Sequence, residues 1–471
     1  MPDDLKILKD LILTAAEKAR KETSDSPEPE LTQSFEWPVE CTVGPGLEGA
    51  IACESKIGYV NGSKGWLIYR GYDIFDLCAH STYEEVSYLL MHGSLPSVSQ
   101  LSVFKQKLVN YRMINKTLRL LMGFEVEKMN AMSALRLGTN LMRQEFTSCD
   151  QEEGRPATDD AIGADEDSIP METKPMGEEH AIYEFKSPVP DNAALLEQQV
   201  EDAGGIEACY HLISGVATLT AAIARVHQGH MPIEPDPDLS HAGNLLYMFT
   251  GRRPSPVEER IMDIALILHA DHGMNASTFA SMVVASTLSD IYFSVGSGIA
   301  ALNGPLHGGA NEQVIRTLDE IGDVRNVKAW VDTVLSSKGK IAGFGHRVYK
   351  AYDPRARILG PLAEFLVERN QEHKPLFQTA HGLEREVHTR LSSEKQIFPN
   401  VDFYSGVVYR CLGIAPEMFT PIFVLSRVAG WAAHVFEQRS NNRLIRPGAE
   451  YIGPDQLEFV AIEDRNASIE V

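Results

Sequence analysis

Helical hydrophobic periodicity runs through almost the whole chain from residue 205 onward, and this pattern constrains the fold most strongly. Apolar residues recur at helical intervals in segments such as GIEACYHLISGVATLTAAIARVHQG and PVEERIMDIALILHADHG. The sequence carries neither a strand–helix alternation nor an internal repeat. We therefore predict an all-α, mainly helical fold. Residues 275–302 are rich in Ala, Ser and Gly, which predicts a helix that packs closely against a neighbour.

One exception to the helical pattern lies near the start of the chain. In IGYVNGSKGWLIYRG, β-favouring residues flank Asn61 and Gly62, which predicts a small β-hairpin. The following segment, HSTYEEVSYLLMHG, carries overlapping capping-box patterns that begin at Ser81 and Thr82. It predicts a helix that stops at Gly93.

Three further segments define the organisation of the chain. The first 22 residues predict an amphipathic helix, with one side formed by Leu5, Leu8, Ile12, Ala15, Ala16 and Ala19. Residues 23–36 (TSDSPEPELTQSFE) predict a polar linker. Residues 149–202 are acidic, contain Pro and Gly, and are poor in large apolar side chains. They predict a surface insertion, because such a segment cannot bury enough apolar surface to offset the entropy of ordering.

The overall charge excludes several classes of partner. The 471 residues include 65 Asp and Glu against 43 Lys and Arg, a formal net charge of −22. Such a chain is not expected to bind nucleic acid or anionic membranes non-specifically. No apolar run appears long enough to span a bilayer, and the N-terminus carries acidic residues, unlike a signal or transit peptide. The sequence therefore predicts a cytoplasmic protein with no membrane or nucleic-acid partner.

The cysteine pattern agrees with that location. Six cysteines occur in the chain, none of them in a C-x-x-C pair: Cys41, Cys53, Cys78, Cys149, Cys209 and Cys411. This spacing argues against a disulfide framework and against a zinc ribbon. Reduced thiols are the expected state.

Two histidine segments are candidates for chemistry. In LILHADHGMNAS, His269 and His272 are three residues apart and would be neighbours on a helix face. A zinc site is one interpretation, but no third ligand has a recognised spacing, and core or capping histidines would explain the pair alone. In ALNGPLHGGANE, His307 lies at a junction between two helices, where the adjacent glycines allow a ligand to approach the backbone.

The other two candidate segments supply positive charge and a carboxylate. KGKIAGFGHRVYKAYDPRARIL places His346 on a Gly-rich turn among a cluster of basic residues, Lys338, Lys340, Arg347, Lys350, Arg355 and Arg357. This is the strongest positive patch in an acidic chain and indicates an anion site. In NVDFYSGVVYRCLGI, Asp402 stands among apolar residues before a helix. It is either a base with a shifted pKa or a helix cap.

Taken together, these segments predict carbon-acid chemistry on a polyanionic substrate. Asp402 would remove a proton while His307 and His346 polarise carbonyl oxygens. No serine or cysteine nucleophile motif and no NAD-binding loop competes with this interpretation.

At these residues the chain resembles the citrate synthase family. The segments LILHADHGMNASTFA, ALNGPLHGGANE, GFGHRVYKAYDPR and NVDFYSGVVY follow one another in the family's order. The resemblance extends from about residue 47 to residue 465, outside the acidic insertion, and includes VSYLLMHGSLP, PDPDLSHAGNLLYMFTG and RPGAEYIGP. One departure is Gly273, where many bacterial members carry an acid after HADH.

The resemblance implies a role for each catalytic candidate. Asp402 matches the base that takes a methyl proton from acetyl-CoA. His307 matches the group that stabilises the enol or enolate, and His346 matches the residue that polarises the carbonyl of oxaloacetate. No metal and no cofactor are implied, because acetyl-CoA is a substrate.

The resemblance also implies the binding residues. The oxaloacetate ligands would be His272, Arg355, Arg427 and Arg446, of which Arg446 is supplied by the other subunit of a homodimer. The backbone lining the adenine of CoA would be Lys340, Ile341, Ala342, Gly343 and Phe344. Arginine suits this task because its guanidinium fork matches a carboxylate.

The family's fold implies a helical dimer whose small domain closes over the substrates. Carried over, residues 1–36 are an N-terminal helix and linker, residues 37–309 the large domain with the insertion, residues 310–407 the small domain and residues 408–471 the rest of the large domain. The leading function is citrate synthase. The alternatives are 2-methylcitrate synthase, which uses propionyl-CoA, a non-catalytic scaffold that binds partners through the insertion, and a metal-binding regulator.

Overall fold

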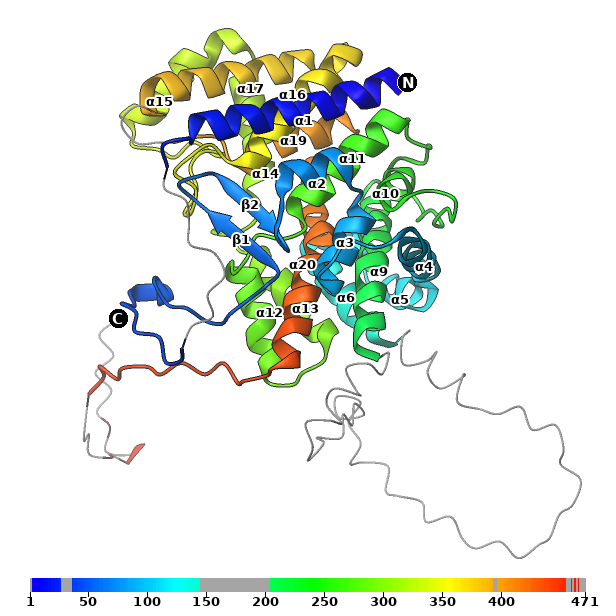
Figure 1. Ribbon diagram of the computed structural model, residues 1–471, viewed down its shortest axis with the longest axis vertical. Helices are drawn as coiled ribbons and strands as arrows, with labels where there is room; N and C mark the ends of the chain where they lie inside the picture. Colours follow the sequence, from blue (N-terminus) through cyan, green and yellow to red (C-terminus); the bar gives the residue numbers. More distant parts are fainter. Residues whose placement is uncertain are drawn as a thin grey trace, which may run out of the picture.

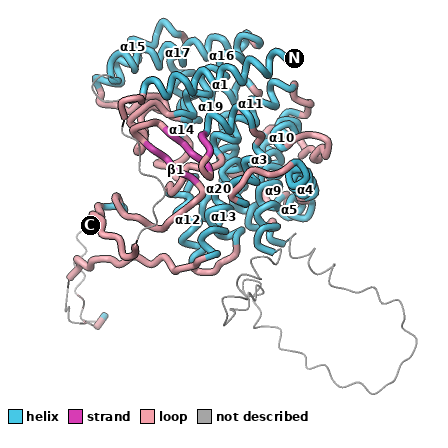
Figure 2. Tube along the Cα trace, in the orientation of Figure 1, coloured by secondary structure: helices cyan, strands magenta, loops and turns pink. Residues whose placement is uncertain are grey.

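The computed structural model describes residues 2–26, 36–144, 204–392 and 397–454, together with residues 459, 461, 462 and 465. The predicted all-α fold with a small β element is confirmed (Figures 1 and 2). The acidic insertion, most of the predicted linker and Cys149 lie outside the described residues. The five other cysteines are free thiols.

The helices of the N-terminal half are α1 (Pro2–Glu22), α2 (Ile74–His80), α3 (Tyr83–His92), α4 (Val98–Asn110), α5 (Asn115–Leu121), α6 (Ala131–Leu141) and α9 (Gly204–His227). Those that follow are α10 (His241–Thr250), α11 (Pro256–His269), α12 (Ala276–Ser286), α13 (Ile291–Leu302), α14 (Ala310–Ile321), α15 (Val327–Ser336), α16 (Pro354–Arg369), α17 (Lys374–Val387), α19 (Val401–Cys411) and α20 (Phe419–Ser440). Short 3-10 turns occupy Pro45–Leu47, Val126–Lys128, Val324–Asn326, Gln371–His373 and Pro416–Met418, and a π-helical turn occupies His388–Ser392.

The helices form two groups around a continuous apolar core. At one end, α15, α16, α17 and α19 lie together with α1 beside them, while α9, α12, α13 and α20 form the opposite part (Figure 1). Helix α20 contacts α9, α12 and α13 of the second group, and it also contacts α14, which packs against α17 and α19 of the first group. It is therefore the central helix of the molecule, and the site described below gathers around it.

Helix α1 is docked onto the body rather than held apart by a linker. Leu8, Ile12, Ala15 and Ala16 are buried against α2 and α16, as its amphipathic pattern predicts. Leu5 was expected on the same side but is 40% exposed. Both ends of the helix form ion pairs with α16, Asp4 with Arg369 and Glu22 with Arg357.

The predicted hairpin is part of a three-stranded antiparallel sheet, β1 (Gly58–Asn61), β2 (Trp66–Tyr69) and β3 (Tyr72–Asp73). Asn61 pairs with Trp66, so the turn spans residues 62–65 and is longer than a two-residue Asn-Gly turn. Gly62 touches the segment that carries His346: a Cβ at this position would lie 2.0 Å from the carbonyl oxygen of Val348. The sheet therefore supports the site from one side.

Helix α3 begins with one of the two predicted capping boxes. The side chain of Thr82 accepts from the backbone N–H of Glu85, and the carboxylate of Glu85 accepts from the backbone N–H of Thr82. The alternative capping box at Ser81 does not form, because Ser81 is the C-cap residue of α2. As predicted, the helix ends at Gly93, whose φ of 82° suits glycine.

The single helix expected over residues 275–302 is wrong. The chain reverses after α12, with Leu288 at a φ of 67°, and Asp290 caps the start of α13. The two helices pack side by side, and a Cβ at Gly298 would lie 2.5 Å from Oγ of Ser281. Small residues permit this close approach, but their pattern does not reveal where the helix breaks.

Two helices are long and apolar enough to cross a membrane by length and composition alone, which corrects the expectation that no such run exists. They span Gly205–His227 and Pro416–Ser440, and 89% of each apolar window is buried inside the molecule. Burial of this kind is the packing of core helices. It explains their composition without a bilayer.

Candidate active site

The structure brings together six of the seven predicted catalytic and oxaloacetate-binding residues. They come from six places in the fold: the turn after α11, the junction before α14, the turn before α16, the first turn of α16, the first turn of α19 and the middle of α20. They are His272, His307, His346, Arg355, Asp402 and Arg427. The charge of Arg427 acts on His272, His307 and Asp402, which identifies α20 as the common neighbour.

The two histidines of the HADH segment are not neighbours on a helix face, which corrects the sequence prediction. Helix α11 ends at His269, which is fully buried and whose Nδ1 lies 2.7 Å from the carbonyl oxygen of Ala265. His272 lies in the turn beyond the helix end, where its ring centroid is 5.2 Å from that of His346. His269 is therefore a core residue and His272 faces the site.

His307 is held as a neutral ring in one tautomer. The backbone N–H of Ser277 donates to its Nε2 at 3.2 Å, and Oγ of Ser277 lies 2.8 Å from the same atom. Because a backbone N–H can only donate, Nε2 is the acceptor and the ring proton lies on Nδ1. Burial, aided by Arg427, lowers the pKa of His307 to about 4. Nδ1–H is thus available as a neutral hydrogen-bond donor.

His346 is held in the opposite tautomer. The backbone N–H groups of Val348 and Tyr349 donate to its Nδ1 at 3.0 and 3.2 Å. The proton therefore lies on Nε2. Burial, followed by the charge of Arg355, lowers the pKa of His346 to about 4. The ring is a second neutral donor.

Asp402 has the environment of a base and does not cap its helix. The cap of α19 is Asn400, whose Oδ1 accepts from the backbone N–H of Asp402 at 3.0 Å. Within the described ranges, no group donates a hydrogen bond to the carboxylate of Asp402. Burial raises its pKa to about 6, against the opposing charges of Arg355 and Arg427. A carboxylate with this pKa is ionised at neutral pH and still able to take up a proton.

Hydrogen bonds join the turn that carries His346 to the residues just before α19, the helix that carries Asp402. The backbone N–H of Asn400 donates to the carbonyl oxygen of Gly343 at 2.8 Å, and its Nδ2 donates to the carbonyl oxygen of Gly345 at 3.0 Å. The backbone N–H of Gly345 donates to the carbonyl oxygen of Phe398 at 2.9 Å. These bonds fix the base relative to the histidine.

The two arginines are buried, with 2% exposure for Arg355 and 1% for Arg427. Arg355 forms a bidentate ion pair with Asp353, with Nε–Oδ1 at 3.0 Å and Nη2–Oδ2 at 2.8 Å. Arg427 donates from Nε to the carbonyl oxygen of His269 at 2.6 Å, while its buried Nη2 has no partner among the described residues. A buried guanidinium nitrogen without a partner is costly, and an anionic ligand would satisfy it.

Arg446 is not part of this cluster within one chain. It is exposed, in the segment that runs away from the helical body after α20 (Figure 1). The predicted CoA-binding stretch lies in the turn between α15 and α16. Lys340 is exposed there, Ile341 is 9% exposed and Gly343 has a φ of 78°.

Sequence reasoning missed several residues that hold the site. The hydroxyl of Tyr349 lies 3.3 Å from Nε2 of His272, and its ring packs against His346 at 4.8 Å between centroids. Ser277 fixes the ring of His307, and Asp353 fixes the guanidinium of Arg355. Asn400 fixes the turn that carries His346. Tyr349 and Asp353 stand inside GFGHRVYKAYDPR, Ser277 inside LILHADHGMNASTFA and Asn400 at the start of NVDFYSGVVY, so position within those segments was the available signal.

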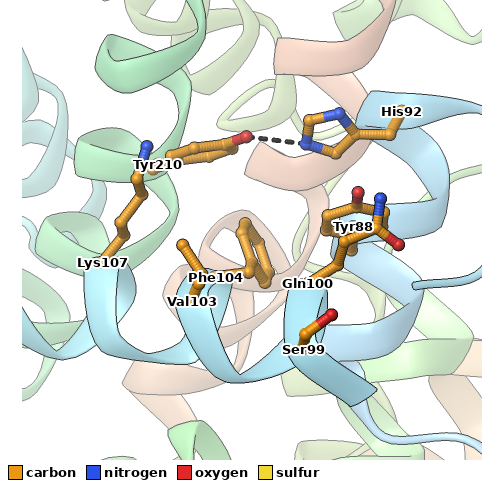
Figure 3. Close-up of a pocket in the computed structure, with 8 residues that line it drawn as sticks. All are labelled: Tyr88, His92, Ser99, Gln100, Val103, Phe104, Lys107 and Tyr210. Atoms are coloured by element: carbon orange, nitrogen blue, oxygen red, sulfur yellow. Dashed lines mark hydrogen bonds between the residues drawn. The ribbon is translucent and has the colours of Figure 1, made fainter. Parts of the chain in front are cut away.

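Two surface cavities lie away from this site. One surface cavity of about 310 Å³ lies between α3, α4 and α9, where Nε2 of His92 is 2.6 Å from the hydroxyl of Tyr210 (Figure 3). Another of about 450 Å³ lies between α16 and α17. Neither is lined by a site residue. In the described part of the chain, no three His, Cys, Asp or Glu residues are grouped so that they could hold a metal ion.

Fold and site together define a class: mainly helical proteins whose acid–base residues converge from several helix ends on a buried arginine pair. The chain belongs to the citrate synthase family, because the family model "Citrate synthase, C-terminal domain" matches residues 46–448. With that family, it is an enzyme of the transferase class.

Individual relatives agree. Citrate synthase from Deinococcus radiodurans is 39% identical over 427 residues, which cover 90% of this chain and 99% of the relative. The crystal structure of citrate synthase from Pyrobaculum aerophilum gives a TM-score of 0.74 at 36% identity, covering 93% of this chain and all of the other. The structure of a ternary complex of carboxymethyl coenzyme A and oxaloacetate with citrate synthase from Thermoplasma acidophilum gives a TM-score of 0.73 at 30% identity. The match covers 90% of this chain and all of the Thermoplasma chain.

Proposed function

We propose that this chain condenses acetyl-CoA with oxaloacetate and water to give citrate and CoA. The observation that carries the proposal is the convergence of one carboxylate with a raised pKa, Asp402, on two neutral histidines of opposite tautomer, His307 and His346. Such a set suits proton removal next to a carbonyl, followed by attack on a second carbonyl.

In the first step, the carboxylate of Asp402 takes a proton from the methyl carbon of acetyl-CoA. The electron pair left behind forms an enol or enolate, whose oxygen receives the hydrogen bond of Nδ1–H of His307. A neutral imidazole suits this role, since it stabilises the developing charge without having to be protonated first. The Ser277 N–H supports the assignment, because it keeps the other ring nitrogen occupied.

In the second step, the enolate carbon attacks the ketone carbon of oxaloacetate. Nε2–H of His346 donates to the ketone oxygen and assists its protonation as the new C–C bond forms. The product is citryl-CoA. Water then cleaves its thioester, which releases CoA and citrate.

The carboxylates of oxaloacetate would be bound by Arg355, Arg427 and His272. The unpartnered Nη2 of Arg427 and the depressed pKa of His272, which burial and the arginines cause, support an anion between them. The dicarboxylate needs a further cation at its open end. We propose that Arg446 of a second copy supplies it in a homodimer, since its own chain leaves it exposed.

The remaining assignments belong to the same proposal. Residues 340–344 would line the adenine of CoA with backbone, and residues 310–407 would form a small domain that closes over both substrates. The latter boundary falls within α19, which ends at Cys411. A cytoplasmic location, reduced thiols and the absence of a cofactor complete the proposal.

A thiol-release assay tests it. Purified protein is mixed with oxaloacetate and either acetyl-CoA or propionyl-CoA, and free CoA is followed with a thiol reagent. We expect rapid release with acetyl-CoA that depends on oxaloacetate. Faster release with propionyl-CoA would favour 2-methylcitrate synthase, and no release with either would favour a scaffold protein.

A further inference from the structure

The C-terminal end of α11 is bound by one face of α20. Oγ of Ser426 donates to the carbonyl oxygen of Leu266, and Nε of Arg427 donates to that of His269 at 2.6 Å. One turn further along, the backbone N–H of Gly430 donates to the carbonyl oxygen of Ala270 at 3.1 Å. The last carbonyls of a helix have no partner within it, so α20 satisfies groups that would otherwise be buried without hydrogen bonds.

A buried hydrogen bond between His434 and Asp271 completes this contact. Nε2 of His434 lies 3.1 Å from Oδ1 of Asp271, and both side chains have 0% exposure. The other carboxylate oxygen, Oδ2, accepts from the backbone N–H of Gly273 at 2.8 Å. Burial alone would raise the pKa of Asp271, but His434, Arg427 and the Gly273 N–H together hold it below its ordinary value. The buried carboxylate is therefore charged and satisfied at both oxygens.

The backbone of Asp271 is held as firmly as its side chain. Its N–H donates to the hydroxyl of Tyr69 at 3.2 Å, and its carbonyl oxygen accepts from the same hydroxyl at 2.9 Å. A Cβ at Gly58 would lie 2.1 Å from Oδ2, and one at Gly430 would lie 2.9 Å from Oδ1. Strand β1 and helix α20 therefore pack closely against the carboxylate of Asp271 from two sides, and glycine at both positions leaves space for it.

Asp271 is followed directly by His272, and His434 lies seven residues after Arg427 on the same face of α20. We propose that Asp271 and His434 are positioning residues, which fix His272 and Arg427 relative to each other for binding of the oxaloacetate carboxylates. This inference rests on the proposed function. In this role, Asp271 and His434 neither contact the substrate nor transfer a proton.

The test compares two variants at one position. His434→Leu removes the donor to Asp271, whereas His434→Gln keeps an amide donor in nearly the same place. We expect His434→Leu to raise the KM and the calorimetric Kd for oxaloacetate by about tenfold or more, the effect of losing one charge-assisted hydrogen bond. The KM for acetyl-CoA and kcat should change less, and His434→Gln should restore most of the affinity.

A matched control separates positioning from general loss of stability. His211 on α9 is also a buried histidine, with Nδ1 2.8 Å from the hydroxyl of Tyr292 and its ring 5.4 Å from that of Tyr111 between centroids. We expect His211→Leu to lower the thermal midpoint without changing the Kd for oxaloacetate. If His434→Leu does not fold, Asp271→Asn, which is nearly isosteric, should give the same increase in Kd.

Three outcomes would overturn the inference. Wild-type affinity for oxaloacetate in a folded His434→Leu protein is one, and an equal rise in the KM for acetyl-CoA is another. The third is a His434→Gln protein that binds as weakly as His434→Leu. In all three the wild-type protein still binds oxaloacetate and turns over, so the proposed function stands; a wild-type protein without either property overturns both.

Discussion

Both carboxylate oxygens of Asp353 accept hydrogen bonds from the guanidinium of Arg355, and Oδ2 also accepts from the backbone N–H of Val401 at 3.2 Å. Both side chains are buried. One carboxylate thus joins the start of α16, the guanidinium beside the site and the start of α19. This group links the two helices that carry Arg355 and Asp402, which also pack directly against each other.

Asp353→Asn should therefore both destabilise the protein and weaken oxaloacetate binding. Leaving one member of a buried pair uncompensated costs about 3 kcal/mol or more. Thermal unfolding and the KM for oxaloacetate measure the two effects. Asp323 is a matched control, because it makes the same bidentate contact with Arg325 on the surface. Asp323→Asn should change neither quantity, and equal effects of the two substitutions would contradict the role of Asp353.

Asp402→Asn should abolish proton abstraction and leave oxaloacetate binding largely intact. The amide has nearly the same shape but cannot take up the proton, so kcat should fall by about 10²- to 10⁴-fold. Steady-state kinetics give kcat, and calorimetry gives the Kd for oxaloacetate. Near-normal turnover in the variant would mean that another residue is the base.

The pH dependence of kcat/KM should follow Asp402. Its carboxylate must be deprotonated to act, and its pKa is raised to about 6, so kcat/KM should fall as the pH drops through about 6. The pKa values of His307 and His346 lie near 4, so both rings stay neutral over this range. Thermal midpoints at each pH separate titration from unfolding. A rate that stays constant between pH 7 and pH 5 would rule out this assignment.

Deleting residues 150–179 with a short Gly/Ser joint should leave activity and folding nearly unchanged. The composition of this segment is acidic and poor in large apolar residues, and long insertions add little closure entropy. Activity and the thermal midpoint check the result, with a variant of equal length and scrambled sequence as control. Loss of the folded protein on deletion would show that the segment contributes to the core.

Mixing two inactive variants should restore activity if sites are shared between subunits. Arg446→Ala chains lack the donated arginine, and Asp402→Ala chains lack the base. A mixed dimer then contains one site with both defects and one with neither. After random exchange, about a quarter of wild-type activity should return. Exchange confirmed by mass without any return of activity would mean that each site is built from one chain.

The sequence by itself determined the fold class and supplied the candidates for the reacting groups. Helical periodicity is a local property, so it predicted the helices, the docked face of α1 and the stop at Gly93. The motif GFGHRVYKAYDPR, together with His307 and Asp402, predicted candidate reacting groups from their residue types and their glycine neighbours. Both kinds of information are contained within a few consecutive residues.

Tertiary structure decided how those groups can act. The tautomer of His307 depends on Ser277, 30 residues away in sequence, and the carboxylate of Asp271 depends on His434, 163 residues away. Residues 275–302 broke into two helices because packing, not periodicity, decides where a chain reverses. Proton positions, pKa values and unpartnered buried atoms depend on which groups come into contact across the core. Local spacing along the chain does not predict those contacts.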